Sequence, residues 1–376
     1  MGTFRGVELD DLVLTGPRLV LRPWTAADAP RIVEVMADPR SRRFLALPEP
    51  YTRADADHYI GELAIPARAA GRGLECAVVQ RATGRIVGSA ALRLQADPEI
   101  GYWVAGDAQG NGYAAEATGV LSDWAFGTGV PRVRLAAAVD NLPSIRTALA
   151  AGFRFEGVAR DGHLGGGTGR VPELRADLAR FSRLAGDRPG RLPYVFPPLP
   201  GPGLSDGTLR LRPARAEDAP ALAATDDELT LRWNFTGRAH PPDEVRRQCA
   251  QAGLMWLVGS VALFAMVDEA TGRVAGSLRL RQAGPPQVGG IGYVVHPAFR
   301  GRGYTARALR LLVPWAFEVA DFARLELGAK VGNEASLRAA AAAGFEPDGV
   351  RQARLRNADG TFSDEVRYAL INPKYR

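Results

Sequence analysis

Apolar and polar positions follow the same order twice along this chain. Short apolar or alternating runs indicate strands, and longer runs with apolar residues every three or four positions indicate helices. In each half, a strand and two helical regions precede a hairpin, and a strand then enters a glycine-rich turn. A long helix, a strand, a helix and a closing hairpin follow. We expect strands at 18–22, 76–79, 86–94, 100–104 and 132–139, with counterparts at 208–212, 263–267, 274–280, 291–295 and 324–331, and long helices at 114–126 and 305–319.

The two halves also repeat their polar and glycine positions in register. Ile100 recurs as Ile291, 191 positions later, and Asn141 recurs as Asn333, 192 positions later. A period of this length is that of a domain and is too long for a solenoid repeat. The sequence therefore predicts two tandem copies of one α/β domain.

A proline-rich stretch separates the two copies. Its prolines are Pro189, Pro193, Pro197, Pro198, Pro200 and Pro202. Proline at this density disfavours both helix and sheet, so we expect a semi-rigid extended linker whose apolar residues 194–196 could pack on one domain. We predict a first domain over 1–185, a linker over 186–204 and a second domain over 205–376.

Composition excludes several classes of protein. Hydrophobic residues make up 46% and charged residues 23% of the chain, as in ordinary globular proteins, and the net charge is +6. The arginines are spread along the chain, which argues against a nucleic-acid-binding arm and leaves anionic ligands as candidates. The longest apolar stretch, 254–267, is too short to cross a bilayer, and we expect it to be a core strand.

The cysteines and the N-terminus suggest a compartment. Cys76 and Cys249 lie in different copies, and neither has a thiol at the matching position of the other copy. We expect both to be buried thiols in a reducing environment. Because the N-terminus shows no apolar leader, the expected location is the cytoplasm. No His/Cys cluster offers a metal site, so we expect no metal.

The glycine-rich turn at the start of each long helix is the most informative local feature. Gly110 and Gly112 in the first copy correspond to Gly301 and Gly303 in the second. Such a turn directs successive backbone N–H groups and the positive end of a helix at one point, which suits a phosphate. The motifs of Walker loops and dinucleotide folds are missing. A helix-entry turn without a ligand is the alternative, and the repetition with matched flanks favours the phosphate site.

With its flanks, the repeated block resembles the GNAT acyltransferase superfamily, and within it the RimJ/RimL type. The family pattern is Gln/Arg-x-x-Gly-x-Gly/Ala after a central strand, then Asn-x-x-Ser and Gly-Phe. Residues 109–114 fit fully, and 300–305 fit except for Thr305 at the last small position; 141–144 and 333–336 fit the second motif. The resemblance implies two tandem GNAT domains, each with a mixed, largely antiparallel twisted sheet flanked by helices.

The resemblance also implies the ligands. The expected donor is acetyl-CoA or another acyl-CoA, and the expected acceptor is a primary amine of a small molecule or peptide. In the family, the donor's pyrophosphate lies on the glycine turn and its pantetheine arm pairs with the end of the central strand. The donor-binding residues implied are Val104, Gln109, Gly110, Asn111, Gly112, Tyr113, Ala114 and Asn141, and in the second copy Val294, Val295, Arg300, Gly301, Arg302, Gly303, Tyr304, Thr305 and Asn333.

The amine attacks the thioester directly in this family, so a base must deprotonate an ammonium and an acid can protonate the leaving thiolate. Glu99 and His163 are the candidate bases. Ser144 and Ser336 are the candidate proton donors, with helix capping as their structural alternative. The structural alternative for Glu99 is a solvated carboxylate at a strand end, and for His163 a surface position in a glycine-rich loop.

The second copy lacks both candidate bases. Gly290 stands at the position of Glu99, and Leu355 stands near that of His163. We therefore expect the chemistry in the first copy. An enzyme that uses a long acyl group, or one bound to an acidic carrier protein, in peptide natural-product biosynthesis is the alternative activity. A non-catalytic acyl-CoA-binding or assembly protein is the alternative of another class. We expect no nucleic-acid or membrane partner, and we expect the two domains to pack as a pseudo-dimer.

Overall fold

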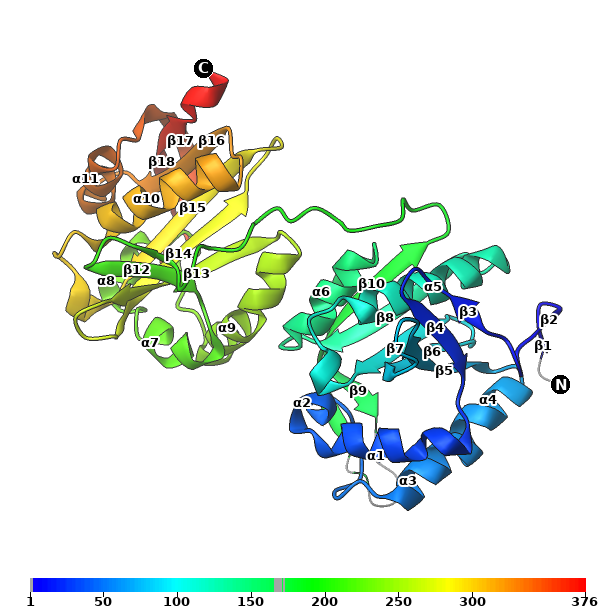
Figure 1. Ribbon diagram of the computed structural model, residues 1–376. Helices are drawn as coiled ribbons and strands as arrows, with labels where there is room; N and C mark the ends of the chain where they lie inside the picture. The colour runs from blue at the N-terminus through cyan, green and yellow to red at the C-terminus, as the bar shows by residue number, and fades with distance from the viewer. Residues whose placement is uncertain (1–2, 166–170, 172) are drawn as a thin grey trace. The chain divides into compact units, whose positions relative to one another are not determined.

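Each half of the chain folds around one eight-stranded sheet with helices on its faces (Figure 1). The computed structural model describes residues 3–165, 171 and 173–376. Contacts within the chain divide it into two units, Met1–Pro193 and Tyr194–Arg376. The fold predicted from the sequence, two α/β domains with mixed and largely antiparallel sheets, is confirmed.

The first sheet has the strand order β3-β4-β5-β6-β7-β8-β10-β9. Only β7 and β8 run parallel. Its strands are β3 (Leu14–Thr15), β4 (Leu19–Pro23), β5 (Gly73–Gln80), β6 (Ile86–Arg93), β7 (Glu99–Val104), β8 (Arg132–Ala138), β9 (Arg154–Gly165) and β10 (Leu174–Leu184), beside a separate pair of β1 (Thr3–Phe4) and β2 (Val7–Glu8). The helices are η1 (Ala26–Asp28), α1 (Ala29–Ala37), α2 (Pro39–Arg42), α3 (Arg53–His58), η2 (Tyr59–Ala64), α4 (Ile65–Ala69), η3 (Gly106–Ala108), α5 (Tyr113–Gly127) and α6 (Leu142–Ala150).

The second sheet repeats this topology in the order β11-β12-β13-β14-β15-β16-β18-β17. Again one pair, β15 with β16, is parallel. The strands are β11 (Leu204–Ser205), β12 (Leu209–Pro213), β13 (Val261–Asp268), β14 (Val274–Gln282), β15 (Val288–Val295), β16 (Arg324–Lys330), β17 (Glu346–Arg356) and β18 (Phe362–Ile371). The helices are η4 (Ala216–Asp218), α7 (Ala219–Ala223), α8 (Glu228–Trp233), α9 (Pro242–Leu257), η5 (Pro297–Phe299), α10 (Tyr304–Pro314), η6 (Trp315–Val319), α11 (Glu334–Ala342) and η7 (Pro373–Tyr375).

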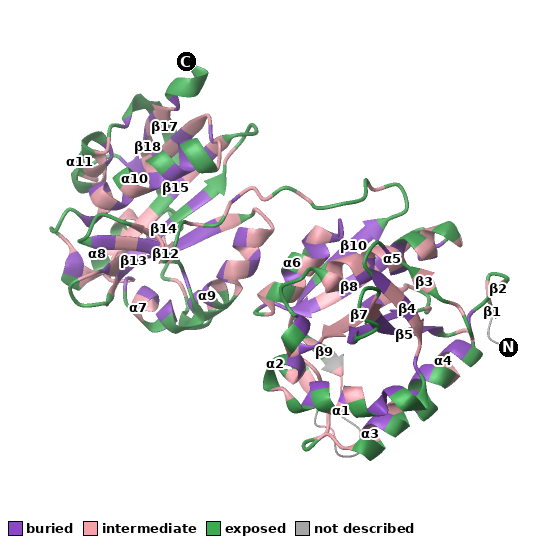
Figure 2. Ribbon diagram, viewed as in Figure 1, coloured by how far each residue is buried: buried purple, intermediate pink, exposed green. Residues whose placement is uncertain are grey.

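Buried residues concentrate on the central strands and on the helix faces that cover them (Figure 2). The core of the second unit includes Phe196, which comes from the proline-rich stretch and is 1% exposed. Its ring packs against Trp256 and Phe322, and its carbonyl accepts a hydrogen bond of 2.9 Å from Trp256 Nε1. This apolar anchor joins the end of the proline-rich stretch to the second unit.

Two expectations about secondary structure are wrong. Residues 254–257 belong to the end of α9, and the strand β13 begins only at Val261. Leu254 and Trp256 are buried on that helix, so the apolar run of the sequence continues from the helix into the strand without a break. Gly259, with φ of +76°, makes the turn between helix and strand. His163 lies within β9 and not in a loop.

Both cysteines, Cys76 and Cys249, are buried free thiols as expected. Burial raises the pKa of each to about 11, so neither is a thiolate at neutral pH. Across the described ranges, no helix is both long and apolar enough to cross a membrane.

Candidate active site

The parallel strands β7 and β8 separate after two residue pairs. Their register holds only for Glu99 with Arg134 and Ile100 with Leu135, although β7 continues to Val104. In the second sheet, β15 and β16 separate after Ile291. Beyond these points, no strand formed by the described residues lies along this edge of β7 or of β15. Each sheet therefore contains an open strand edge in its interior.

Successive residues of a strand direct their backbone N–H and C=O groups to opposite edges, so only every second residue faces that opening. The N–H of Ala105 bonds to Val87 of β6, so the N–H and C=O groups of Tyr102 and Val104 point the other way, toward the opening. In the second unit the N–H of His296 bonds to Ala275, which leaves Tyr293 and Val295 facing the opening. Val294, included in the predicted donor site, directs its backbone toward β14.

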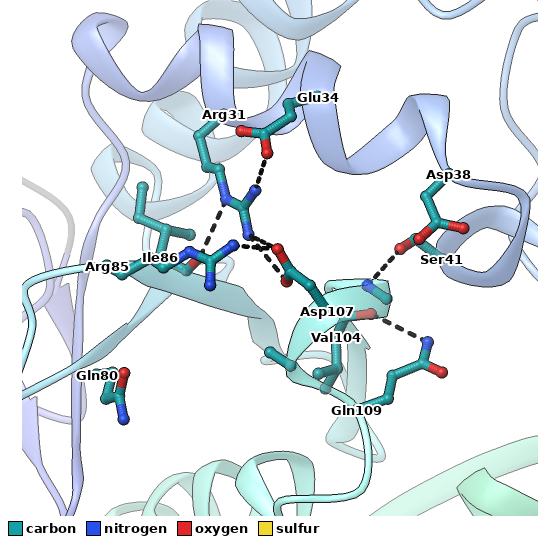
Figure 3. Close-up of polar contacts among 12 residues, drawn as sticks. Arg31, Glu34, Asp38, Ser41, Gln80, Arg85, Ile86, Val104, Asp107 and Gln109 are labelled. Atoms are coloured by element: carbon teal, nitrogen blue, oxygen red, sulfur yellow. Dashed lines mark hydrogen bonds and ion pairs between the residues drawn. The ribbon is translucent and has the colours of Figure 1, made fainter.

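Side chains from α1 and α2 fix the turn that follows β7 (Figure 3). Asp107 forms ion pairs with Arg31 (3.2 Å) and with Arg85, and the N–H of Gly106 donates to Ser41 Oγ at 2.9 Å. Gln109, predicted to bind the donor, lies at the end of this turn with Nε2 at 3.4 Å from the carbonyl of Val104. The turn is thus held in place before any ligand binds.

The glycine turn presents a row of backbone donors in both copies. All four glycines adopt left-handed φ angles: +80° at Gly110, +75° at Gly112, +76° at Gly301 and +72° at Gly303. Within the described structure, the N–H groups of 110–115 and 301–306 have no hydrogen-bond acceptor. Apart from the adjacent residues in the chain, no described atom lies within 4 Å of a Cβ built on Gly110, Gly301 or Gly303. We call these two turns the cradles; each is an open set of N–H donors at a helix N-terminus, which suits a phosphate.

The side chains around the first cradle support the turn. Arg18 pairs with Glu116 at 2.7 Å, donates to the carbonyl of Asn111 at 3.0 Å and lies over the ring of Tyr113. Asn111 donates its own side-chain amide to Ala108 at 3.1 Å. In this structure these groups hold the cradle, and Arg18 adds positive charge beside it.

The second cradle is also supported by an ion pair, in which the helix residue carries the opposite charge. Arg307 takes the position of Glu116 and pairs with Asp206 at 2.7 Å. Tyr304 donates to Asp268, whereas Tyr113 accepts from Gln80 at 2.9 Å. Arg302 stacks on Phe299, and Thr305 follows Tyr304 in the first turn of α10, as Ala114 follows Tyr113 in α5.

Arg300, at the first position of the second cradle motif, is held by the protein. Its guanidinium forms a bidentate ion pair with Asp227 at 2.6 and 2.7 Å and donates to Thr230 Oγ1 at 2.9 Å. Asp227 caps α8, so this pair fixes the turn to a helix 73 residues upstream. Hydrogen bonds from Arg300, which outweigh the opposing effect of burial, hold the pKa of Asp227 well below its usual range.

The Asn-x-x-Ser motif forms the same local structure in both copies. Asn141 Oδ1 accepts the N–H of Ser144 at 3.2 Å, and Asn333 Oδ1 accepts that of Ser336 at 3.3 Å, so both asparagines cap their helices. The hydroxyl of Ser144 lies 2.6 Å from the phenol of Tyr102 on β7. The corresponding distance from Ser336 to Tyr293 is 2.7 Å.

A match to a family model decides the classification. The model for the "Acetyltransferase (GNAT) domain" matches residues 18–154 and, separately, 208–346. This chain belongs to the GNAT family. Together with the two sheets, the double match makes it a tandem GNAT protein.

Individual relatives match one domain or less. The chain is 30% identical over 117 residues to the probable N-acetyltransferase YjcK of Bacillus subtilis, covering 31% of this chain and 56% of that relative. It is 25% identical over 153 residues to an uncharacterized N-acetyltransferase, p20, of Bacillus licheniformis, covering 38% and 83%. The chain therefore spans little more than half the length of YjcK.

Solved structures of similar fold also cover about one domain. The ribosomal-protein-S5-alanine acetyltransferase of Vibrio fischeri is 21% identical and covers 45% of this chain and 96% of its own, with a TM-score of 0.41. A RimL ribosomal L7/L12 α-N-protein acetyltransferase in complex with coenzyme A is 22% identical and covers 45% and 97%, also with a TM-score of 0.41.

The first GNAT domain has a cavity of about 880 Å³ on the sheet face covered by α1 and η2. Glu99 and His163 both line it. Glu99 lies 3.5 Å from Arg93 and 3.8 Å from Arg134, whereas His163 is half exposed with Nδ1 at 3.1 Å from Glu173. Both predicted bases therefore line one cavity, Glu99 from β7 and His163 from β9, with β8 and β10 between these strands. Ser144 does not line this cavity, but its partner Tyr102 does.

The sequence analysis missed two carboxylates of this cavity. Glu156 on β9 is paired with Arg132 at 2.7 Å. The other is Glu75 on β5, whose side chain accepts a hydrogen bond of 3.1 Å from the phenol of Tyr59. No motif includes this position. The available signal was a single acidic residue in the otherwise apolar run 74–79.

The second GNAT domain carries different side chains at the equivalent positions. The strand registers give five equivalent pairs of positions: Glu75 and Leu263, Ala91 and Arg279, Glu99 and Gly290, Ala138 and Lys330, and Leu178 and Glu365. Lys330 is buried, donates to the carbonyl of Arg232 at 3.1 Å and has its pKa lowered by burial. Among the described residues of this GNAT protein, no group of three or more His, Cys, Asp or Glu side chains could hold a metal ion.

Proposed function

We propose that this chain is an acyl-CoA-dependent N-acyltransferase and that its first domain carries out the reaction. The acyl group is acetyl or another acyl group, and the acceptor is a primary amine of a small molecule or peptide. The observation that carries the proposal is the continuity of three parts: an open strand edge on β7, a cradle of free N–H groups after it, and a cavity with carboxylates beside it. The names of the two Bacillus relatives as N-acetyltransferases support transfer to nitrogen.

The donor would bind mainly to the backbone. Its pyrophosphate suits the N–H groups of 110–115, where Arg18 adds positive charge. The amide groups of its pantetheine arm suit the exposed edge at Tyr102 and Val104, since a strand edge offers both N–H donors and C=O acceptors. This arrangement would deliver the thioester to the side of the sheet that faces the cavity.

The acceptor nitrogen would then attack the thioester carbon, forming an amide bond and breaking the C–S bond. Glu99 would take the proton that the ammonium must lose, and the hydroxyl of Ser144 would supply one to the departing thiolate. The second proton that the nitrogen loses as the amide forms would restore the Ser144 hydroxyl. Tyr102 orients that hydroxyl at 2.6 Å. Burial raises the pKa of Tyr102 to about 12, so its phenol stays protonated at neutral pH. His163, half exposed on the cavity wall, is the second candidate base.

A donor-binding role without turnover is favoured for the second domain. Its cradle and its Tyr293–Ser336 pair match those of the first domain. However, Gly290 replaces the proposed base, and the buried Lys330 replaces a small residue of the cavity. The second domain would therefore bind acyl-CoA through its cradle and support the active domain.

Calorimetric titration with acetyl-CoA tests the proposal. Gly112→Trp and Gly303→Trp each block one cradle, because the bulky side chain replaces a glycine with left-handed φ. We expect the wild type to bind, each variant to lose one set of sites, and acetyl transfer to an amine panel to disappear only in Gly112→Trp. Absence of binding heat in the wild type would refute an acetyl-CoA-dependent function. Loss of transfer only in Gly303→Trp would move the chemistry to the second domain.

A further inference from the structure

Glu75 is a carboxylate on the wall of the first-domain cavity, and the cations nearest to it, Arg93 and Arg68, act on it without direct contact between the charged groups. It forms no ion pair with any residue that the structure describes, whereas Glu99 on the same wall has Arg93 and Arg134 nearby. Among the described residues, the hydrogen bond from Tyr59 is the only one that the Glu75 side chain forms. A carboxylate in such a setting costs free energy that a bound cation would offset.

Strand register places Glu75 level with the start of the open edge. Glu75 pairs with Ala91 across β5 and β6, and Ala91 pairs with Gly101 across β6 and β7. Directly opposed residues project to the same face, so Glu75 shares the face of Gly101. Two strand spacings separate their backbones, about 10 Å, and a glutamate side chain spans part of that distance. A cation on Glu75 would therefore lie beside the edge where the thioester is proposed to bind.

Toward α1 and η2 the surroundings of Glu75 are aromatic and apolar, whereas Arg93 lies beside Gly101. Trp24 stacks on Trp103 with ring centres 6.1 Å apart, and Tyr59 meets Trp24 edge-on at 6.0 Å. Aliphatic side chains of α1 line the same cavity, including Ile32 and Met36. Aromatic rings favour an ammonium group, and the aliphatic wall favours an apolar substituent on it.

We propose that Glu75 binds the ammonium group of the acceptor and that the acceptor of the first domain is a primary amine carried on an apolar, aromatic or branched aliphatic group. This proposal rests on the proposed function, since it assigns the amine side of the same reaction. Glu75 would bind and position the acceptor, and Glu99 would remain the proposed base. In the second domain Leu263 stands at this position, so that domain has no equivalent ammonium site.

The pH dependence of amine binding gives the proposal a signature. Burial raises the pKa of Glu75, and the nearby Arg93, Tyr59 and Arg68 act in the opposite direction without cancelling the increase. The carboxylate is charged only above this raised pKa. The affinity for the amine should therefore fall as the pH is lowered through the pKa of Glu75. This fall should occur at a higher pH than it would for a glutamate with an ordinary pKa.

The test uses two probe amines with the full-length protein saturated with CoA. 2-Phenylethylamine has an apolar substituent, and ethanolamine has a polar one. Calorimetry should show 2-phenylethylamine binding, a Kd raised about tenfold or more in Glu75→Gln, and an unchanged Kd in Glu62→Gln, an exposed glutamate of η2 outside the cavity wall. Ethanolamine should bind at least about tenfold more weakly than 2-phenylethylamine.

Each remaining outcome decides the proposal. Equal 2-phenylethylamine affinity in the wild type and Glu75→Gln would overturn the role of Glu75, provided the variant still binds acetyl-CoA and is therefore folded. Wild-type protein that binds acetyl-CoA but not 2-phenylethylamine would overturn the inference and leave the proposed function standing. Amine binding that depends on Glu75, with no binding of acetyl-CoA, would overturn the proposed function and leave the amine site at Glu75 standing. Ethanolamine binding as tightly as 2-phenylethylamine would overturn the apolar acceptor class.

Discussion

The cradles of the two domains have nearly the same glycine φ angles, whereas the residues beside them differ in charge and size. The first cradle glycines have φ of +80° and +75°, and the second pair have +76° and +72°. The hydroxyls of Ser144 and Ser336 lie 2.6 and 2.7 Å from their tyrosines. On the cavity side, Glu75 and Glu99 have become Leu263 and Gly290.

The difference follows from which atoms do the binding. A cradle of backbone N–H groups needs only a permitted φ angle and a supported turn, so the residues around it can change freely. Even the supporting ion pair differs: Glu116 pairs with Arg18, whereas Arg307 at the same helix position pairs with Asp206, two residues before the counterpart of Arg18. An acceptor site is built from side chains, and each substitution there changes the chemistry. The comparison teaches that the proposed donor half and acceptor half of one fold can diverge independently.

The largest expected effect concerns the stability of the second domain alone. Phe196→Ala removes an aromatic anchor that is 1% exposed, so we expect the free energy of unfolding of this domain to fall by about 3–5 kcal/mol. Phe153→Ala, at a fully buried site of the first domain, is the matched variant. Hydrogen exchange resolved by peptide should show each loss in one domain only. An equal loss in both domains would contradict their independence as folding units.

The next effect concerns turnover. Glu99→Gln removes the proposed base and should lower kcat about 100-fold or more, equivalent to about 2.7 kcal/mol, while the Kd of acetyl-CoA stays the same. Glu326→Gln is the control, because Glu326 lies on β16 opposite Gly290 and is held by Arg324 and Arg367. Steady-state kinetics with a saturating amine measures both. Unchanged turnover in Glu99→Gln would remove Glu99 from the mechanism.

The smallest effect is a pH dependence confined to the second domain. The pKa of Asp227 is lowered in the folded state, so its pair with Arg300 contributes full stability above the usual aspartate pKa of about 3.9. That contribution is lost as the pH falls further, toward the lowered value. Because both side chains are partly exposed, Asp227→Asn should cost only about 0.5–1 kcal/mol at pH 7. Thermal unfolding between pH 7 and pH 2 checks this; a cost that persists in strong acid would refute the ion-pair explanation.

Much of the fold was accessible from the sequence because it depends on local patterns. The glycines at 110 and 112 and the asparagine at 141 act through neighbouring backbone groups, so their spacing alone predicts a turn and a helix cap. The repeated register then fixed the order of elements in both domains. The prediction of a strand at residues 254–257 was wrong because a buried helix end and a buried strand show the same apolar run in a sequence.

The parts of the candidate site that the sequence analysis did not predict depend on contacts between residues distant in the sequence. Arg300 fits a donor-binding motif, but its partner Asp227 lies 73 residues away. Glu75 sits on a strand whose two faces cannot be told apart from its sequence, and only the packing of α1 and η2 over one face reveals the cavity around it. Strand pairing, and not motif spacing, brought this carboxylate level with Gly101.

The separation of β7 from β8 has a consequence for amide hydrogen exchange. In the free protein, the amides of Tyr102 and Val104 face the opening, while those of Gly101 and Trp103 face β6. Protection along this strand should therefore alternate with a period of two residues, fast at the outward amides and slow at the inward ones. A ligand that takes the place of the missing strand would slow the fast set and remove the alternation. The sheet would then become continuous through a molecule that is not part of the chain.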